Sequence, residues 1–174
     1  ILEKAKSHGK LTGLVTTTPI TDATPAAFTA HIRDRTLFAA IAVQMANADI
    51  DVLLGGGENA FLPVTQKGCY EKPGERHDGR NIISEAVNRD ATWVCDARGL
   101  KAVDRESDKR LIGLFADQGM IRPFSPSLAD MTRKAISVLA RGENGFFLMV
   151  EAGHHVREDV GLLVVRLDRR ADRL

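Results

Sequence analysis

Five consecutive apolar residues, Phe146–Val150, are followed directly by an acid, Glu151. An unbroken apolar run of this length is typical of a strand that is covered on both faces, as in a parallel sheet flanked by helices. The run Leu11–Thr16 is also rich in β-forming residues and predicts a second buried strand. Further short strand candidates are Asp49–Leu54, Thr92–Cys95 and Leu111–Phe115.

Helical patterns alternate with these strands. They are the last turns of a helix at Ile1–His8, then Pro25–Ile32, Leu37–Ala46 with Thr36 as its cap, Ile82–Asn88, and an amphipathic helix that Ser127 and Asp130 begin and that ends at Leu139. The polar segment 63–80, which contains several glycines and prolines, is typical of a surface excursion within a domain. The alternation predicts one α/β domain: a doubly wound, mostly parallel sheet flanked by helices.

Composition narrows the classes of function. The chain has 174 residues, of which 44% are hydrophobic and 27% charged, as is usual for a globular domain. Its formal net charge is +1, so no overall positive field favours nucleic acid or an anionic membrane. No apolar run approaches the length of a membrane span, and the first residues lack the pattern of a signal peptide.

The two cysteines, Cys69 and Cys95, have no CxxC spacing and no second pair, which argues against a zinc site. They form either one disulfide or two ordinary thiols. The sequence slightly favours two thiols.

Asp22 and Thr24 follow the strand that is expected to end near Thr17 or Thr18. Thr24 precedes Pro25, and this pair predicts a helix that begins there with Thr24 as its N-cap. In open α/β sheets, ligands bind beyond the carboxyl ends of the strands, so both side chains are candidates for function. The structural alternative is that Thr24 is only a cap and Asp22 only a loop acid near a helix start.

Glu151 also lies at the carboxyl end of an expected strand. Together with Asp22 and Thr24 it would offer two carboxylates and a hydroxyl, the hard oxygen ligands that suit Mg²⁺. We therefore expect these three side chains to point into one crevice.

Several blocks of this sequence resemble the alkaline phosphatases. They are TGLVTT with DATPAAF, DIDVLLGGGENAF, DGRNIISEA, IGLF and PSLADMTRKAISVLARGENGFFLMVE, in this order, within residues 1–153. The resemblance implies a partial alkaline phosphatase-like fold for residues 1–153. Residues 154–174 form a divergent C-terminal tail that either joins the same domain or frays.

The resemblance also implies roles for single residues. Asp22, Thr24 and Glu151 correspond to the family's magnesium ligands, and Arg35 to the arginine that binds substrate phosphate. A planar, bidentate guanidinium suits that task. The helix that begins near Pro25 must then end before Arg35, because an unbroken helix would carry the guanidinium away from Asp22. Without the resemblance, Arg35 would be a solvated charge at a helix end.

At the level of the whole protein, the family hydrolyses phosphate monoesters through a phosphoserine, with zinc and magnesium as cofactors. It is periplasmic or secreted, and a homodimer is compatible with the resemblance. Its partner molecules are a phosphate monoester or inorganic phosphate.

Other family features are not found in this sequence. The nucleophilic serine of an Asp-Ser-Ala motif would lie upstream of Ile1, and the zinc-binding DxxxH pattern does not follow Glu151. His154 and His155 are either a remnant of the family's zinc histidines or not ligands at all. We therefore expect a segment of an alkaline phosphatase that is inactive in isolation. The alternative is a non-catalytic domain that binds Mg²⁺ or phosphate, or an interaction fragment.

Overall fold

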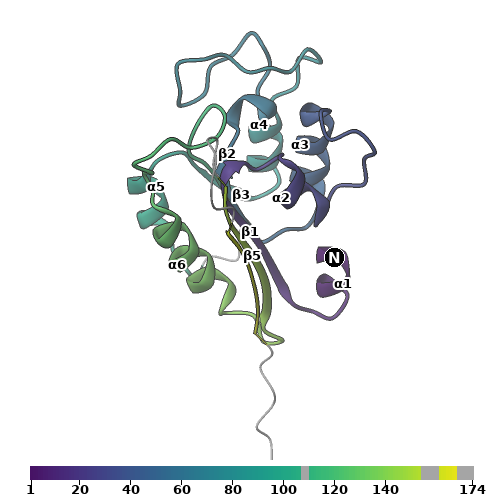
Figure 1. Cartoon of the computed structure of the whole chain (residues 1–174), viewed down its shortest axis with the longest axis vertical. Helices are drawn as coiled ribbons and strands as arrows, with labels where there is room; N and C mark the ends of the chain where they lie inside the picture. Colours follow the sequence, from purple (N-terminus) through teal and green to yellow (C-terminus); the bar gives the residue numbers. More distant parts are fainter. Residues whose placement is uncertain (107–109, 154–160, 168–174) are drawn as a thin grey trace, which may run out of the picture.

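The computed structural model describes residues 1–106, 110–153 and 161–167. Among these residues, a sheet of six strands forms the centre of the fold, with helices on either side (Figure 1). The strands are β1 (Leu11–Pro19), β2 (Val52–Gly56), β3 (Ala91–Val94), β4 (Arg110–Leu114), β5 (Phe146–Ala152) and β6 (Gly161–Leu167). Their order in the sheet is β3-β4-β2-β1-β5-β6. All neighbouring pairs are parallel except β5 and β6, which are antiparallel. The mostly parallel α/β sheet predicted from the sequence is confirmed.

Helices cover both faces of the sheet (Figure 1). One face carries α1 (Leu2–Lys6), α2 (Ala23–Ala27), α3 (Phe38–Asn47) and α4 (Ile82–Val87), and the other carries α5 (Ala97–Ala102) and α6 (Leu128–Leu139). A short 3₁₀ helix, η1 (Glu58–Phe61), follows β2. Within the described ranges, the buried apolar residues form two clusters, one on each side of the sheet. A sheet buried on both faces explains why β5 reads as a continuous apolar run.

The N-caps of three helices agree only in part with those predicted from the sequence. Ser127 caps α6 as predicted, since its side chain accepts a hydrogen bond from the Asp130 amide. The cap of α2 is Asp22 and not Thr24, which lies inside the first turn. Likewise Thr36 does not cap α3: the N-cap is Leu37, which makes no side-chain cap. At α2, two residues that can cap, Asp22 and Thr24, lie close together. Before α3, the Thr36 hydroxyl instead donates to the Asp34 carboxylate within the loop (2.6 Å).

The segment 63–80 is largely exposed, as predicted, but one buried side chain anchors it. Arg76 is only 2% exposed. Its guanidinium donates to the carbonyl oxygens of Ala39 (2.6 Å) and Ala60 (3.2 Å) and pairs with the carboxylate of Asp78. Arg76 therefore links this segment to α3 and to η1.

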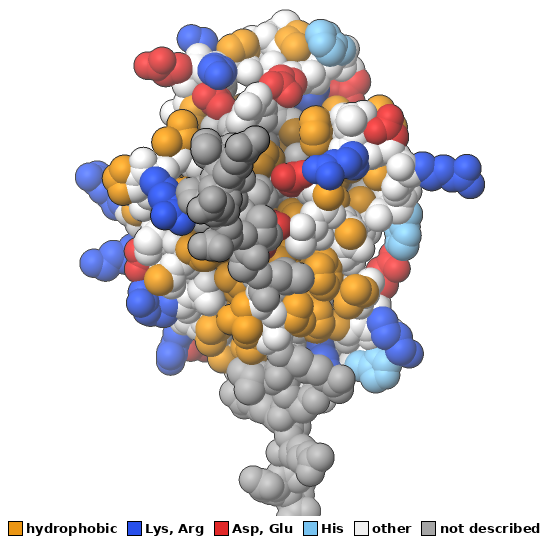
Figure 2. All heavy atoms as spheres, in the orientation of Figure 1, with side chains coloured by type: hydrophobic (Ala, Val, Ile, Leu, Met, Phe, Trp, Pro, Cys, Tyr) orange, Lys and Arg blue, Asp and Glu red, His pale blue; other side chains and the backbone are white. Residues whose placement is uncertain are grey.

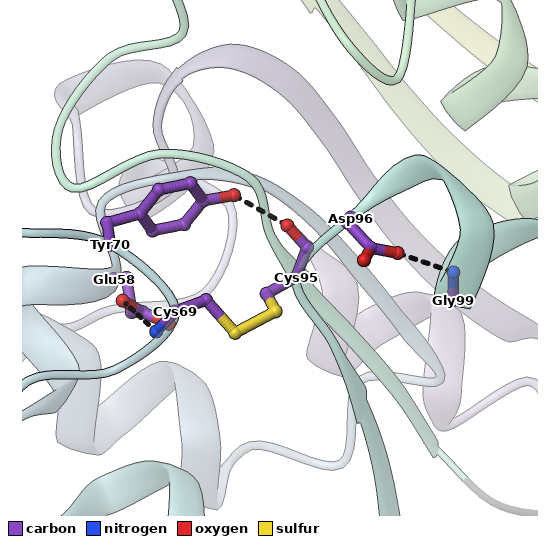
Figure 3. The surroundings of a disulfide bond; sticks show 6 residues. All are labelled: Glu58, Cys69, Tyr70, Cys95, Asp96 and Gly99. Carbon is purple, nitrogen blue, oxygen red and sulfur yellow. Dashed lines mark hydrogen bonds between the residues drawn. A yellow bond between two sulfur atoms is a disulfide. The ribbon is translucent and has the colours of Figure 1, made fainter.

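A disulfide joins Cys69 to Cys95. The preference for two thiols was wrong, because the fold brings the two Cα atoms to 6.4 Å, within bridging range. Figure 3 shows the surroundings: the Tyr70 hydroxyl donates to the Cys95 carbonyl oxygen (2.5 Å), and the Cys69 amide donates to the buried carboxylate of Glu58 (3.1 Å). The segment 63–80 is thus tied covalently to the residue that follows β3.

The surface carries charges of both signs. On the face in Figure 2, basic and acidic side chains are interspersed, while hydrophobic side chains gather between α6 and α1. Among the described residues, no helix combines the length and the hydropathy that a membrane crossing requires.

Candidate active site at the carboxyl ends of β1 and β5

Two parallel neighbours, β1 and β5, bring the candidate residues to one edge of the sheet. Thr16 of β1 stands opposite Glu151 of β5 in the register. Both strands run in the same direction, so their carboxyl ends meet at this edge. Glu151 is the last residue but one of β5, and Asp22 follows β1 after a short turn.

Glu151 is buried, with 5% of its surface exposed. Its Oε2 atom accepts hydrogen bonds from the hydroxyls of Thr16 (2.7 Å) and Thr18 (3.3 Å). Beyond it, Gly153 is held by Thr17, whose hydroxyl donates to the Gly153 carbonyl oxygen (2.9 Å). The described residues place no cationic side chain in an ion pair with this carboxylate, although a buried charge needs compensation.

Arg35 lies in the loop between α2 and α3, as predicted from the required break in the helix. Its Nη2 donates to Oδ1 of Asp22 at 2.6 Å. The same carboxylate oxygen accepts from the Ala23 amide (2.7 Å), which is the cap of α2. The side chain of Arg35 is two-thirds exposed, and its Nη1 and Nε atoms have no hydrogen-bond partner among the described residues. Asp22 therefore orients Arg35 and leaves its other edge available.

The donor set at this edge consists of oxygens. Oδ2 of Asp22 and Oε1 of Glu151 make no hydrogen bond within the described ranges. Nor do three His, Cys, Asp or Glu side chains in those ranges gather into a metal-binding group. A magnesium ion held by Asp22 and Glu151 would have to complete its shell with hydroxyls, such as that of Thr24, and with water. Oxygen donors alone fit Mg²⁺ better than zinc.

The convergence of Asp22, Thr24 and Glu151 on one ion remains a prediction. Thr24 lies in the first turn of α2, next to the Asp22 cap. His154 and His155 lie outside the described residues.

Sequence reasoning gave no role to Thr16 and Thr18, which contact Glu151. Their signal is present in the sequence as three successive threonines at the end of a strand. However, only the pairing of β1 with β5 reveals that two of these hydroxyls face the acid.

Comparisons with known proteins identify the family and support the fold. The family model for alkaline phosphatase matches residues 1–159. Alkaline phosphatase 3 of Bacillus subtilis is 39% identical over 88% of this chain and 33% of its own length. The alkaline phosphatase of Escherichia coli is 32% identical over 91% of this chain and 42% of its own length. The chain thus spans less than half of these relatives.

Solved structures show the same likeness. The alkaline phosphatase of Thermus thermophilus superposes with a TM-score of 0.68 and 33% identity, over 83% of this chain and 29% of that one. A variant of the alkaline phosphatase from the Antarctic bacterium TAB5, with Mg bound in its M3 site, gives a TM-score of 0.66 and 29% identity, over 85% of this chain and 40% of its own.

Proposed function

Because the chain belongs to the alkaline phosphatase family, we propose that it supplies the phosphate-binding and magnesium-binding part of an enzyme that hydrolyses phosphate monoesters. The full-length enzyme would act through a phosphoserine, with zinc and magnesium, in the periplasm or outside the cell, and a homodimer is compatible with the family resemblance.

The observation that carries this proposal is the pair formed by Arg35 and Asp22. The 2.6 Å contact uses one edge of the guanidinium. The remaining N–H groups can bind two phosphate oxygens at once, which a lysine cannot do with the same geometry. Phosphate bound there would lie beside Asp22, at the edge where parallel sheets bind ligands.

Asp22, Glu151 and Thr24 would hold the magnesium ion. Bound magnesium would supply positive charge that offsets the two carboxylates and the substrate phosphate. The chain's own part is to orient these ligands: the cap of α2 holds Asp22, and Thr16 and Thr18 hold Glu151. These hydrogen bonds use one oxygen of each carboxylate and leave the other for the ion.

Titration of the chain with inorganic phosphate tests the role of Arg35. Arg35→Lys should weaken binding by about tenfold, since one charge-assisted hydrogen bond is worth roughly 1.5 kcal/mol or more. The control is Arg33→Lys, an exposed arginine of the same loop. Equal affinities for the two variants would contradict the proposal.

Titration with Mg²⁺ tests the ligands in the same way. Asp22→Asn and Glu151→Gln should each abolish the saturable heat of binding measured by calorimetry. Glu143→Gln, an exposed acid in the loop before β5, should leave it unchanged. Binding that survives both substitutions would place the ion elsewhere. A full-length protein that binds both ligands but hydrolyses no monoester would instead support the non-catalytic alternative.

A further inference from the structure

A cavity of about 210 Å³ lies beside Asp22. Its walls come from segments that follow three parallel strands: Asp22 after β1, Asn59 in η1 after β2, and Gln118 after β4. Phe38, the first residue of α3, and Glu75, from segment 63–80, also line it. The cavity is therefore next to the proposed phosphate site. When phosphate is bound at that site, the cavity can receive the organic part of the substrate.

Asn59 is the most informative residue of this lining. It is 7% exposed, and its backbone is fixed: the amide donates to the Asp117 carbonyl oxygen (3.2 Å), and the carbonyl oxygen accepts from the Glu75 amide (2.9 Å). Its side-chain amide has no hydrogen-bond partner among the described residues, and yet it lines the cavity. An apolar occupant would exclude water from the side-chain amide of Asn59 and give it no hydrogen bond, which costs binding free energy. A polar occupant is therefore favoured there.

The charged side chains of the lining, Asp22 and Glu75, favour a neutral polar occupant over an anionic one. Asp22 is neutralised by Arg35, but Glu75 accepts only a long hydrogen bond of 3.4 Å from the side-chain Nε2 of Gln118 and has no ion pair in the described ranges. An anionic group would be repelled by this carboxylate. A hydroxyl is both a donor and an acceptor, so it can donate to the Glu75 carboxylate and accept from the side-chain amide of Asn59.

The volume of the cavity limits the size of the group that it can hold. Pockets for drug-sized ligands are roughly 300–1,000 Å³, so a cavity of about 210 Å³ suits a group of a few carbons. The ring of Phe38, which is 40% exposed, offers an apolar surface to the carbon chain of such a group.

We propose that this cavity is a subsite for the alcohol part of the substrate and that it selects phosphate monoesters of short neutral polyols over those that carry a carboxylate. The inference rests on the proposed function, because the phosphate must be held by Arg35 while the polyol enters the cavity.

The test compares three probes on the chain by calorimetry or NMR titration: inorganic phosphate, glycerol phosphate, and phosphoglycerate, which has a carboxylate where glycerol phosphate has a hydroxymethyl group. We expect glycerol phosphate to bind about tenfold more tightly than inorganic phosphate, as one or two added hydrogen bonds would give. Phosphoglycerate should bind no more tightly than inorganic phosphate.

Two variants separate the roles of the lining. Asn59→Leu should remove the advantage of glycerol phosphate and leave the affinity for inorganic phosphate unchanged, whereas Asn47→Leu, at the exposed end of α3, should change neither. Glu75→Gln alters an exposed side chain and should improve the binding of phosphoglycerate by about tenfold relative to inorganic phosphate. A thermal melt of each variant confirms that it is folded.

The outcomes distinguish the two proposals. If inorganic phosphate binds and depends on Arg35, but glycerol phosphate has no advantage in the parent chain, the subsite is wrong and the proposed function stands. The subsite is equally wrong if the advantage survives Asn59→Leu in a folded variant and phosphoglycerate gains nothing from Glu75→Gln. If phosphate binding does not depend on Arg35, the proposed function fails, and the subsite fails with it.

Discussion

Tyr70, the single tyrosine of the chain, reports on the environment of the disulfide. Burial raises the pKa of its hydroxyl to about 12, and the negative charges of Glu58, Asp96 and Asp117 contribute to the increase. The neutral hydroxyl donates to the Cys95 carbonyl oxygen at 2.5 Å. The folded chain therefore holds this proton more tightly than the unfolded chain does.

The pH dependence of stability follows from that difference. Below pH about 10 both states hold the proton, and the contribution of Tyr70 is complete. As the pH rises from about 10 through 12, the unfolded chain releases the proton first, so the free energy of unfolding falls. Ultraviolet difference absorbance of the native chain should give a midpoint near 12, and Tyr70→Phe should remove this part of the slope. A native midpoint close to that of the urea-unfolded chain would contradict the expectation.

Asp22 and Thr24 show how far single residues could be predicted. The sequence placed both after a strand and at a helix start, and the structure agrees on the location. It could not decide which of them caps α2, because both residue types cap well. Proline favours the first helical position, whereas Pro25 is the third residue of α2. Arg35 was placed by the family resemblance, whereas its contact with Asp22 depends on the path of the loop between α2 and α3.

At the level of elements, the Cys69–Cys95 bridge should stabilise the chain measurably. It closes a loop across 26 positions, and bridges of this kind contribute about 2–4 kcal/mol. Urea denaturation with and without reductant measures the effect. Reductant should lower the unfolding midpoint of the parent chain but not that of the double variant Cys69→Ala with Cys95→Ala. A shift of equal size in both proteins would show that reductant acts elsewhere.

Helices and strands with a clear hydrophobic pattern or a strong N-cap could be predicted from the sequence. Short elements without such a pattern could not. The amphipathic helix α6 and the apolar strand β5 were both found from their patterns. The helix α5 was missed, since it has six residues and contains a glycine that lowers helix propensity. The disulfide was also beyond prediction, because the distance between Cys69 and Cys95 depends on how segment 63–80 packs against the sheet.

For the molecule as a whole, we expect the isolated 174-residue chain to hydrolyse phosphate monoesters at no more than a trace rate. In the proposed site, magnesium and Arg35 would supply charge and orientation but no attacking group. The hydroxyls of Thr16 and Thr18 already contact Glu151 and have no other base beside them among the described residues.

The assay uses purified chain from a host that lacks its own phosphatase, a chromogenic monoester, alkaline pH, and both Zn²⁺ and Mg²⁺. Robust turnover that Asp22→Ala or Arg35→Ala abolishes would overturn the expectation and would require a nucleophile within this chain.

The pairing of β1 with β5 has a consequence for how the protein is made. β1 leaves the ribosome well before β5. The hydroxyl of Thr16 therefore lacks its hydrogen-bond partner, Glu151, until 135 further residues have been synthesised. Until β5 emerges, one edge of β1 and the apolar side chains beside it stay exposed to solvent and to other nascent chains. Stalled chains that end at Gly142 should therefore be digested readily by protease, while chains that extend through β6 resist it. The newborn polypeptide would depend on holding chaperones throughout the synthesis of the intervening segment.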